Sequence, residues 1–421
     1  MRLRVLTHTF PPSTHANAKR PFYVVRHALA QGWEVEVITS FWAVPPGNPE
    51  TLHHPRLRIR RWHDPVLDWQ RRFQSWPVLY RWAVYLSAAV MFPDACASWA
   101  RGVLKYAQGA LPADRTVAYI LPASWLLAGR MGSVVNRSWV FDYQEPVTPQ
   151  QLRLKRRSPL QRLWRKRLQN LERATLHQAG RILFTSETNR QAYVRLGLAP
   201  AERTVHVPYF YDASVFERPA PEPAPGFEVV YFGTFDWRGA RSPETFLCAL
   251  AEFLRVHPEA RAQTRFRLHG QWPALWDARV RELALADVFI RGRMLDYEEY
   301  LEEVRRSPIL LLVVSPAHDL YMPSKIVDYL GARRPILGMV PSGSEMHALL
   351  VKAGFGRYCA DPGDIAGTRS LLEQLWEAYR WGTLQAPPGD RSFWSSETQL
   401  PFYLQLVESA STDPILSKAG R

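Results

Sequence analysis

The fold class is decided by the first forty residues, MRLRVLTHTF PPSTHANAKR PFYVVRHALA QGWEVEVITS (1–40). Residues 3–9 form an apolar run that predicts a buried strand. Residues 19–31 carry apolar side chains at helical spacing, and Gly32 ends this helix before a second apolar run at 34–40. A strand, a helix and a strand in this order predict one βαβ unit, the building block of a parallel sheet with both faces covered.

The same alternation continues through most of the chain. Short apolar runs predict further strands in the first half, at residues 57–62, 117–121, 139–142, 181–185 and 204–207. The second half alternates again, with strands at 228–233, 265–270, 288–291, 309–314 and 335–340 and helices at 242–257, 273–286, 297–306 and 324–333. Between the halves, the prolines of residues 217–226 exclude a helix or a central strand and indicate an extended linker.

The sequence therefore predicts two Rossmann-like α/β domains. We expect the first over residues 1–216, the linker over 217–226 and the second over 227–389. A C-terminal helix near 397–409, within residues 390–421, is expected to return to the first domain. Because open α/β sheets bind ligands at the carboxyl ends of their strands, we expect the binding site in the cleft between the domains.

The composition limits the classes of function. The 421 residues are 47% hydrophobic and 22% charged, which suits two packed cores and excludes a disordered chain. No apolar run reaches the roughly 18 residues of a membrane span, so we expect a cytoplasmic protein that is soluble or peripheral at a membrane. The net charge of +14, carried mostly by arginine, favours a phosphorylated substrate, anionic lipid or nucleic acid. An arginine-rich source composition is the alternative explanation.

Three cysteines, Cys96, Cys248 and Cys359, are far apart and odd in number. Without a C-x-x-C motif, this pattern favours reduced thiols over disulfides or a zinc site. The sequence also has no D-x-D motif and no His/Cys cluster at ligand spacing. We therefore expect neither a metal nor a cofactor.

The segment with the most chemistry is YMPSKIVDYLGARRPIL (321–337). Pro323 and Ser324 predict a helix start with Ser324 as the N-cap, so free backbone N–H groups there could bind a diphosphate. Lys325 adds a cation, and Asp328 lies one turn further on the same face, where a carboxylate can accept both hydrogen bonds of a ribose diol. The alternative is a surface helix with an ordinary i, i+3 ion pair.

On this segment the chain resembles family 4 retaining glycosyltransferases of the GT-B fold, in the branch with P-S-K-x-x-E-Y-L-x-x-x-x-P-I-L. Further pieces of the resemblance follow in order: Phe10-Pro11-Pro12 with Arg20, Phe141-Asp142-Tyr143-Gln144-Glu145-Pro146, Pro208-Tyr209-Phe210-Tyr211-Asp212, Tyr231-Phe232-Gly233-Thr234-Phe235 with Arg241-Ser242-Pro243-Glu244, and Arg291-Gly292-Arg293-Met294. Each piece is short, and their common order and spacing carry the resemblance over most of the chain.

The resemblance implies transfer of a sugar from a nucleotide diphosphate sugar, with retention at the anomeric carbon and without an obligatory metal. It places Arg241 and Lys325 at the leaving diphosphate, whose charge they would stabilise. Asp328 stands where the family has its ribose-binding glutamate. The remaining donor contacts that it implies are Gly233, Thr234, Arg293 and Ser324.

The chain departs from the family pattern at three places. The earlier family glutamate falls on Leu320, which leaves His318 and Asp319 as alternatives for sugar recognition. The loop after the first strand, STHAN (13–17), has no glycine, although phosphate-binding loops use glycine for close backbone approach.

Gln144-Glu145 stands where the family has Arg-Asp, so the catalytic candidates in the first domain are Asp142 and Glu145. The alternative is that these carboxylates bond backbone amides at a strand end. We expect His15 and Arg20, which follow the first strand, to bind the acceptor.

Two basic and aromatic segments lie in the predicted first domain. Within residues 152–176, Ser158 and Pro159 predict a helix start, and leucines, Trp164 and many basic residues follow. A second segment covers residues 56–81 and continues into the apolar run 78–92. The first segment is typical of a helix that binds an anionic membrane surface. The alternative is that the apolar stripe packs on the sheet while the arginines stay solvated.

The sequence predicts a glycosyltransferase that binds a nucleotide-sugar donor and a lipid-linked or small-molecule acceptor, in cell-envelope or exopolysaccharide synthesis. Transfer to a small soluble natural product is the alternative among enzymes. A noncatalytic nucleotide-sugar or nucleic-acid binding protein is the alternative from another class. Nucleic acid is disfavoured, because no RRM, KH or zinc motif accompanies the basic segments.

Overall fold

The structure is a computed structural model of the chain, and it describes residues 1–13, 15–42, 44, 52–131, 135–153, 158–219, 221–235 and 241–411, apart from the side chains of residues 88, 89, 318 and 411. The chain forms two compact units. The first consists of Met1–Pro208 and Gln399–Arg421, and the second of Tyr209–Thr398. The chain therefore leaves the first unit after Pro208 and re-enters it at Gln399.

The first unit is built on a parallel sheet with the strand order β3-β2-β1-β4-β5-β6-β7. Its strands are β1 (Arg2–Leu6), β2 (Glu34–Ser40), β3 (Leu57–Trp62), β4 (Arg115–Ile120), β5 (Trp139–Tyr143), β6 (Arg181–Phe184) and β7 (Thr204–His206). The predicted strands of the first half are all present. The helix after β1 ends as predicted at Gly32, which adopts φ +79°, a conformation that glycine reaches without strain.

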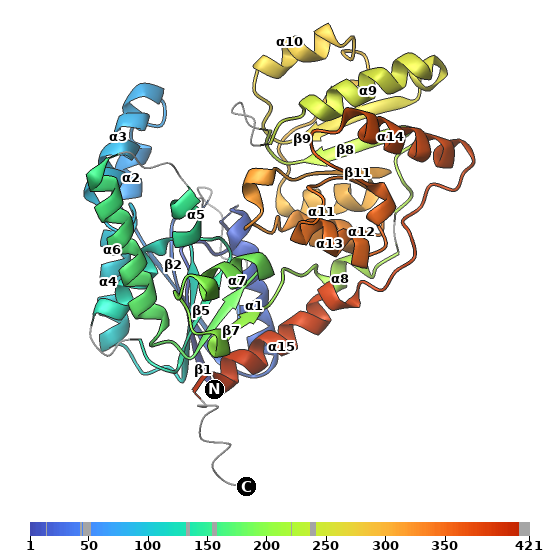
Figure 1. The fold of residues 1–421 in the computed structure, drawn as a ribbon. Coiled ribbons are helices and arrows are strands. Elements are labelled where there is room, and N and C mark those ends of the chain that lie inside the picture. Colours follow the sequence, from blue (N-terminus) through green and yellow to red (C-terminus); the bar gives the residue numbers. More distant parts are fainter. Residues whose placement is uncertain are drawn as a thin grey trace. The chain divides into compact units, whose positions relative to one another are not determined.

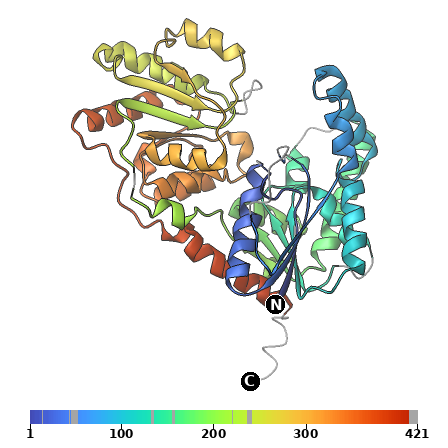
Figure 2. The same ribbon diagram turned by 180° about the vertical axis from the view of Figure 1, so that it is seen from behind.

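Helices cover both faces of this sheet. They are α1 (Lys19–Ala30), α2 (Pro65–Arg71), α3 (Pro77–Val90), α4 (Ala97–Gly109), α5 (Thr148–Arg153), α6 (Pro159–Leu176), α7 (Glu187–Arg195) and α15 (Ser396–Glu408). In the two opposite views, α4 and α6 lie on one face and α1 with α15 on the other (Figures 1 and 2). Side chains alternate along β5, so Phe141 and Tyr143 join the core under α4 and α6, while Asp142 faces α1 and α15.

The second unit repeats this architecture with a parallel sheet in the order β10-β9-β8-β11-β12-β13. Its strands are β8 (Phe227–Phe232), β9 (Thr264–His269), β10 (Phe289–Arg291), β11 (Ile309–Val313), β12 (Ile336–Met339) and β13 (Cys359–Ala360). Its helices are α8 (Ala213–Phe216), α9 (Glu244–Val256), α10 (Leu275–Glu282), α11 (Tyr297–Arg306), α12 (Lys325–Ala332), α13 (Glu345–Lys352) and α14 (Ile365–Arg380).

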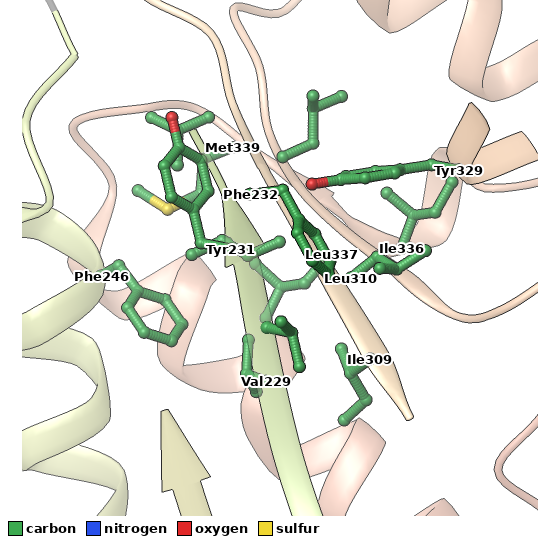
Figure 3. Packing of buried hydrophobic residues seen from close by; sticks show 14 of the residues in the cluster. Val229, Tyr231, Phe232, Phe246, Ile309, Leu310, Tyr329, Ile336, Leu337 and Met339 are labelled. Carbon is green, nitrogen blue, oxygen red and sulfur yellow. The ribbon is translucent and has the colours of Figure 1, made fainter. Parts of the chain in front are cut away.

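The centre of the second unit is a continuous apolar core on both faces of β8. Figure 3 shows Tyr231 and Phe232, neighbours on β8, directed to opposite sides of the sheet, with Phe246 of α9 on the side of Tyr231 and Tyr329 of α12 on the side of Phe232. Strands buried on both faces are the signature of a parallel sheet between two helical layers. The predicted fold class, two Rossmann-like α/β domains with open parallel sheets, is confirmed.

The proline-rich segment 217–226, expected as the linker, lies inside the second unit. Arg305 of α11 and Arg334, which follows α12, hold its backbone. Arg305 donates to the carbonyl oxygen of Pro219 (2.7 Å), and Arg334 donates to that of Pro221. Side-chain donors thus satisfy two backbone carbonyl groups of the segment. Among the described residues, no helix has both the length and the apolar composition that crossing a bilayer requires.

Helix α6 starts where the sequence predicts it, with Ser158 accepting from the backbone N–H of Gln161 (3.4 Å) and Pro159 in the first turn. Its apolar stripe then divides. Leu168 and Leu171 pack in the core on the sheet, whereas Leu160 in the first turn is 74% exposed. The packing alternative drawn from the sequence therefore applies to the second half of this helix, whereas the first half exposes its leucines. The basic residues 155–157 fall outside the described residues.

Candidate functional site

Each sheet has one point at which the strand order reverses, between β1 and β4 in the first unit and between β8 and β11 in the second. Ligands of open α/β sheets bind outside the carboxyl ends of the strands at such a switch point, because the loops there diverge and leave space. In the second unit this edge begins at Phe232, the last residue of β8, and Gly233.

Lys325, the first residue of α12, reaches this edge. Its Nζ donates a hydrogen bond to the carbonyl oxygen of Phe232 (2.8 Å) and lies 4.1 Å from the centroid of the Tyr231 ring. Among the described residues, no carboxylate lies within ion-pair distance of this ammonium group. Loss of water around the group, together with the positive charge of Arg241, lowers the pKa of Lys325 to about 7.

Two glycines, Gly233 and Gly270, leave the backbone around Lys325 without side chains. Gly233 has φ +144°, and a Cβ atom on it would lie 3.0 Å from Lys325 Nζ. Gly270, after β9, has φ +150°, and its Cβ would lie 1.9 Å from the carbonyl oxygen of Gly233. Any larger residue at Gly270 would push the ends of β8 and β9 apart. The partly buried Thr234 continues the same loop.

Asp328 does not pair with Lys325. It is 4% exposed and accepts a hydrogen bond from the hydroxyl of Tyr300 on α11 (2.9 Å). Burial and the Asp328 carboxylate raise the pKa of Tyr300 well above its usual range, so the phenol stays protonated and donates. The sequence analysis missed Tyr300, because its position inside a helix carries no signal of the carboxylate that it meets.

Two further residues of the predicted donor site, Arg293 and Ser324, make contacts other than those that the sequence predicts. Arg293 is exposed and forms a close ion pair with Glu299, which lowers the pKa of Glu299 to about 2. The carbonyl oxygen of Arg293 lies 3.1 Å from Nδ1 of His269, whose ring stacks on Phe232 (5.3 Å between centroids). Ser324 precedes α12, as predicted for an N-cap, but its backbone is helical and its hydroxyl makes no capping hydrogen bond.

Arg241 is exposed and opens the segment that leads to α9. The residues just before it, 236–240, lie outside the described residues. Its effect on the pKa of Lys325 places its charge near that ammonium group. The structure thus brings Gly233, Arg241, Lys325 and Asp328 to the carboxyl edge around β8, and their assignment to a single donor site stays a prediction.

In the first unit, Arg20 and Asp142 form a buried ion pair. Arg20 Nε donates to Asp142 Oδ2 (2.8 Å), and the same oxygen accepts from the hydroxyl of Tyr403 on α15 (2.8 Å). The remaining guanidinium nitrogens of Arg20 donate to the carbonyl oxygens of Val207 and Pro208. Asp142 is 0% exposed and Arg20 is 2% exposed. These side chains join α1, β5 and α15, and neither has surface with which to contact a substrate here.

The expected roles of Asp142 in catalysis and of Arg20 in acceptor binding are therefore revised. Asp142 was assigned from the family resemblance at the end of a predicted strand, and Arg20 from its place after the first strand. The residue that covers both, Tyr403, lies 261 residues from Asp142 in the chain. Glu145, two residues past β5, is partly exposed. His15 is exposed, and its Nδ1 accepts the backbone N–H of Asn17 (3.3 Å). Glu145 and His15 are the accessible candidates of the first unit.

Leu320 stands where the family has a glutamate, and His318 and Asp319 are the alternatives for sugar recognition. Leu320 is buried, so it has no surface for a ligand, and Asp319 is partly buried. The side chain of His318 lies outside the described residues. A hollow of about 450 Å³, lined by Tyr211, Arg333 and residues 385–392, lies at the far end of α12 from Lys325 and takes no part in this site.

The sequence matches no known family profile and no curated protein sequence. The fold matches solved structures over nearly the whole chain. Sucrose-phosphate synthase from Thermosynechococcus elongatus is 16% identical with a TM-score of 0.64, covering 96% of this chain and 98% of that one.

A structure described as trehalose-6-phosphate from E. coli bound with UDP-2-fluoro glucose is 14% identical with a TM-score of 0.58, covering 98% and 97% of the two chains. WaaG, a glycosyltransferase involved in lipopolysaccharide biosynthesis, is 13% identical with a TM-score of 0.55, covering 99% and 96%. At these identities the similarity establishes the fold, which is that of GT-B glycosyltransferases.

Proposed function

We propose that this protein is a retaining glycosyltransferase whose second unit binds a nucleotide diphosphate sugar. The observation that carries the proposal is Lys325, an ammonium group at the carboxyl end of β8 with no carboxylate partner among the described residues. A desolvated cation costs stability, so its retention is best explained by an anion that binds it. The complex of a structural neighbour with UDP-2-fluoro glucose agrees with this class of ligand.

The diphosphate would meet Lys325, Arg241 and the backbone N–H groups at the start of α12. Ser324 leaves these N–H groups without a side-chain cap, and the positive end of the helix adds to the field. The bare backbone at Gly233 lets a phosphate approach closely. Asp328, oriented by Tyr300, would accept hydrogen bonds from the ribose hydroxyls.

In the proposed reaction, the bond between the anomeric carbon and the diphosphate oxygen breaks as Lys325 and Arg241 stabilise the charge on the leaving group. The acceptor hydroxyl oxygen bonds to the anomeric carbon on the same face, and its proton passes to an oxygen of the departing phosphate. The two cations would take the place of a divalent metal in this step. Glu145 and His15 are the candidate acceptor contacts of the first unit.

Nucleotide release from a panel of UDP-, GDP- and TDP-sugars tests the proposal, with and without added membranes and with and without EDTA. We expect the sugar of one class of nucleotide sugar to be transferred to an acceptor or to water, and turnover to continue in the presence of EDTA. Lys325→Met should bind the nucleotide weakly and turn over slowly. Tight nucleotide binding without turnover on any acceptor would favour a noncatalytic binding protein instead. Activity that EDTA abolishes and that Mg²⁺ or Mn²⁺, but not Zn²⁺, restores would contradict the metal-free step.

The acceptor is proposed to be lipid-linked, because the first unit exposes an apolar surface next to a basic one. On α3 and just before it, large apolar side chains face solvent: Trp76, Val78, Leu79, Trp82, Tyr85, Leu86 and Val90. The first half of α6 adds the exposed Leu160 and Leu163. Trp164 on α6 stacks edge-on against Phe92, which follows α3 (6.0 Å), so the two helices adjoin.

The charges of these helices favour an anionic bilayer as the occupant of this apolar surface. Helix α3 has no acidic residue, and the first twelve residues of α6 have none either. The first half of α6 carries Arg162, Lys166 and Arg167 on its exposed side. Basic residues near an anionic surface contribute roughly 1 kcal/mol each, and the apolar side chains would enter the headgroup region.

Vesicle flotation tests this arrangement with a matched pair of tryptophan variants. Trp82 on α3 is 68% exposed and Trp381 of the second unit is 77% exposed, so either can be replaced by glutamine without disturbing a core. Trp82→Gln should lose most of the binding to vesicles of mixed neutral and anionic lipid, whereas Trp381→Gln should bind like the parent. Binding should also weaken as salt is raised. Equal flotation of the two variants would contradict the lipid assignment and favour a small soluble acceptor.

A further inference from the structure

Three potential metal ligands meet at the carboxyl edge of the first sheet. His8 follows β1, Asp64 follows β3, and Cys96 immediately precedes α4. His8 Nε2 lies 3.4 Å from Asp64 Oδ2 and 3.8 Å from Cys96 Sγ, and the three ligand atoms all lie within 4.8 Å of one another. Each of the three residues is buried. They form a nitrogen, oxygen and sulfur triangle in the interior.

Hydrogen bonds and ring packing position the ligand atoms of Asp64 and His8 before any ion binds. Asp64 caps α2 with one oxygen only: Oδ1 accepts the N–H groups of Val66 and Leu67 (3.1 and 3.2 Å), which leaves Oδ2 for His8. The His8 ring meets the Trp99 ring edge-on (4.7 Å between centroids), which fixes its plane. Such preset ligands lose little freedom when an ion binds.

The cysteine is held by a second carboxylate. Asp94 Oδ1 accepts the backbone N–H of Cys96 (3.0 Å), and Asp94 Oδ2 accepts the N–H of Ser124 (3.0 Å). The hydroxyl of Ser124 also bonds Asp94. Groups that orient the ligands of a metal site without touching the ion are a regular part of such sites. Asp94 and Ser124 fit this description.

We propose that His8, Asp64 and Cys96 bind a zinc ion that stabilises the first unit. Bond lengths of about 2.0–2.1 Å to nitrogen and oxygen and about 2.3 Å to sulfur in a tetrahedron give ligand separations of roughly 3.3 Å for N···O and 3.6 Å for N···S. The observed 3.4 and 3.8 Å match this geometry. A mixed imidazole, carboxylate and thiolate set suits zinc better than magnesium, calcium or copper(I).

The thiol of Cys96 and the carboxylate of Asp64 are buried together in this arrangement. Zinc binding would release the thiol proton and neutralise the carboxylate. The site was not visible in the sequence, because His8 lies 56 residues from Asp64 and 88 from Cys96. The inference is independent of the proposed transfer, in which no metal takes part.

Metal analysis and cobalt spectroscopy of the full chain test the site. Protein purified without chelators should contain about one zinc ion per chain. After exchange with Co²⁺, a thiolate-to-cobalt charge-transfer band should appear in the near ultraviolet. The band should disappear in Cys96→Ser and persist in the matched controls Cys248→Ser and Cys359→Ser, whose cysteines lie in the second unit.

Asp64→Asn separates the ligand role from a folding role. Asparagine can still cap α2 through its carbonyl oxygen, so the fold is kept while the anionic ligand is lost. We expect this variant to fold and to bind zinc at least tenfold more weakly, and added zinc to raise its melting temperature less than that of the parent. Absence of bound zinc in the parent, together with no charge-transfer band after cobalt loading, would overturn the proposal. Retention of the band in Cys96→Ser would overturn it as well.

Discussion

The two units bury charge in opposite ways, although both are built from the same parallel sheet with helices on either face. In the first unit Asp142 accepts hydrogen bonds from Arg20 and Tyr403, and Arg20 also donates hydrogen bonds to two backbone carbonyl oxygens. In the second unit Lys325 meets a carbonyl oxygen and an aromatic ring but no carboxylate among the described residues. In the first unit the opposite charges pair with each other, although Asp142 Oδ1 accepts no hydrogen bond from the described residues, whereas in the second unit the described residues supply no counter-charge to Lys325.

This difference teaches how to separate structural from functional charges at the ends of strands. A buried charge that is paired with an opposite charge holds elements together, and removing one partner leaves the other with the full cost of burial. A desolvated charge without a counter-charge reduces stability and gains its partner only on binding. The distinction predicts opposite responses to mutation in the two units.

The largest effect is expected for Arg20→Ala. The variant leaves the carboxylate of Asp142 buried beside the hydroxyl of Tyr403 and without its arginine, and such uncompensated charges cost about 3–5 kcal/mol. The free energy of unfolding of the first unit, followed by urea denaturation, should fall by that amount. Tyr403→Phe removes one hydrogen bond to the same oxygen and should cost about 1–3 kcal/mol. An Arg20→Ala loss below that of Tyr403→Phe would remove the contrast between the units.

Lys325→Met should show the opposite behaviour. Methionine has a similar length without the charge, so the free energy of unfolding should stay unchanged or rise, because a desolvated ammonium group is lost. The value of kcat/KM should fall by about 10²–10³, or about 2.7–4 kcal/mol, the scale of one missing donor to a leaving oxyanion. A variant that unfolds easily but keeps its turnover would make Lys325 a structural residue like Arg20.

Asp328→Ala tests the carboxylate near Lys325, which is buried like Asp142 and accepts a hydrogen bond from the phenol of Tyr300. We expect nucleotide affinity to fall by about 1–3 kcal/mol, the range for charged hydrogen bonds to a diol. Tyr300→Phe, which removes the phenol hydroxyl but keeps the carboxylate, should weaken binding by about 0.5–1.5 kcal/mol. Calorimetry on folded variants measures both. Unchanged affinity in Asp328→Ala would assign this residue to the core instead of to the ligand.

The smallest effect concerns protons. The pKa of Lys325 is lowered from 10.5 to about 7, so above pH 7 the folded protein binds fewer protons at this group than the unfolded chain. The penalty for burying the charge is therefore full below pH 7 and disappears as the pH rises from about 7 towards 10.5, which makes stability increase with pH over that window.

A bound diphosphate reverses this shift, because its negative charge raises the pKa of Lys325. Nucleotide binding at pH 8–9 should thus take up close to one proton, and affinity should decline as the pH rises above about 7. Calorimetry in buffers of different ionisation enthalpy measures the uptake. Lys325→Met should take up none at this group, and the same uptake in both proteins would place the titrating group elsewhere.

The sequence predicted the candidate donor site better than the first-unit site, and the reason is local. Lys325 and Asp328 share one helix turn, and Gly233 ends the strand beside them, so short-range pattern reveals most of the arrangement. In the first unit the deciding contacts are long-range. Tyr403 covers Asp142 from the far end of the chain, and this turns a candidate catalytic carboxylate into part of the core.

By itself, the sequence determined the strand and helix alternation, the start of α6 at Ser158 and the two Rossmann-like domains, because periodicity and capping depend on neighbouring residues. The tertiary structure decided which half of α6 is buried, which charges are satisfied, and that His8, Asp64 and Cys96 meet. These outcomes depend on contacts between residues that are far apart in the chain. A local sequence pattern does not specify which distant residues will bury a given charged group and exclude water from it.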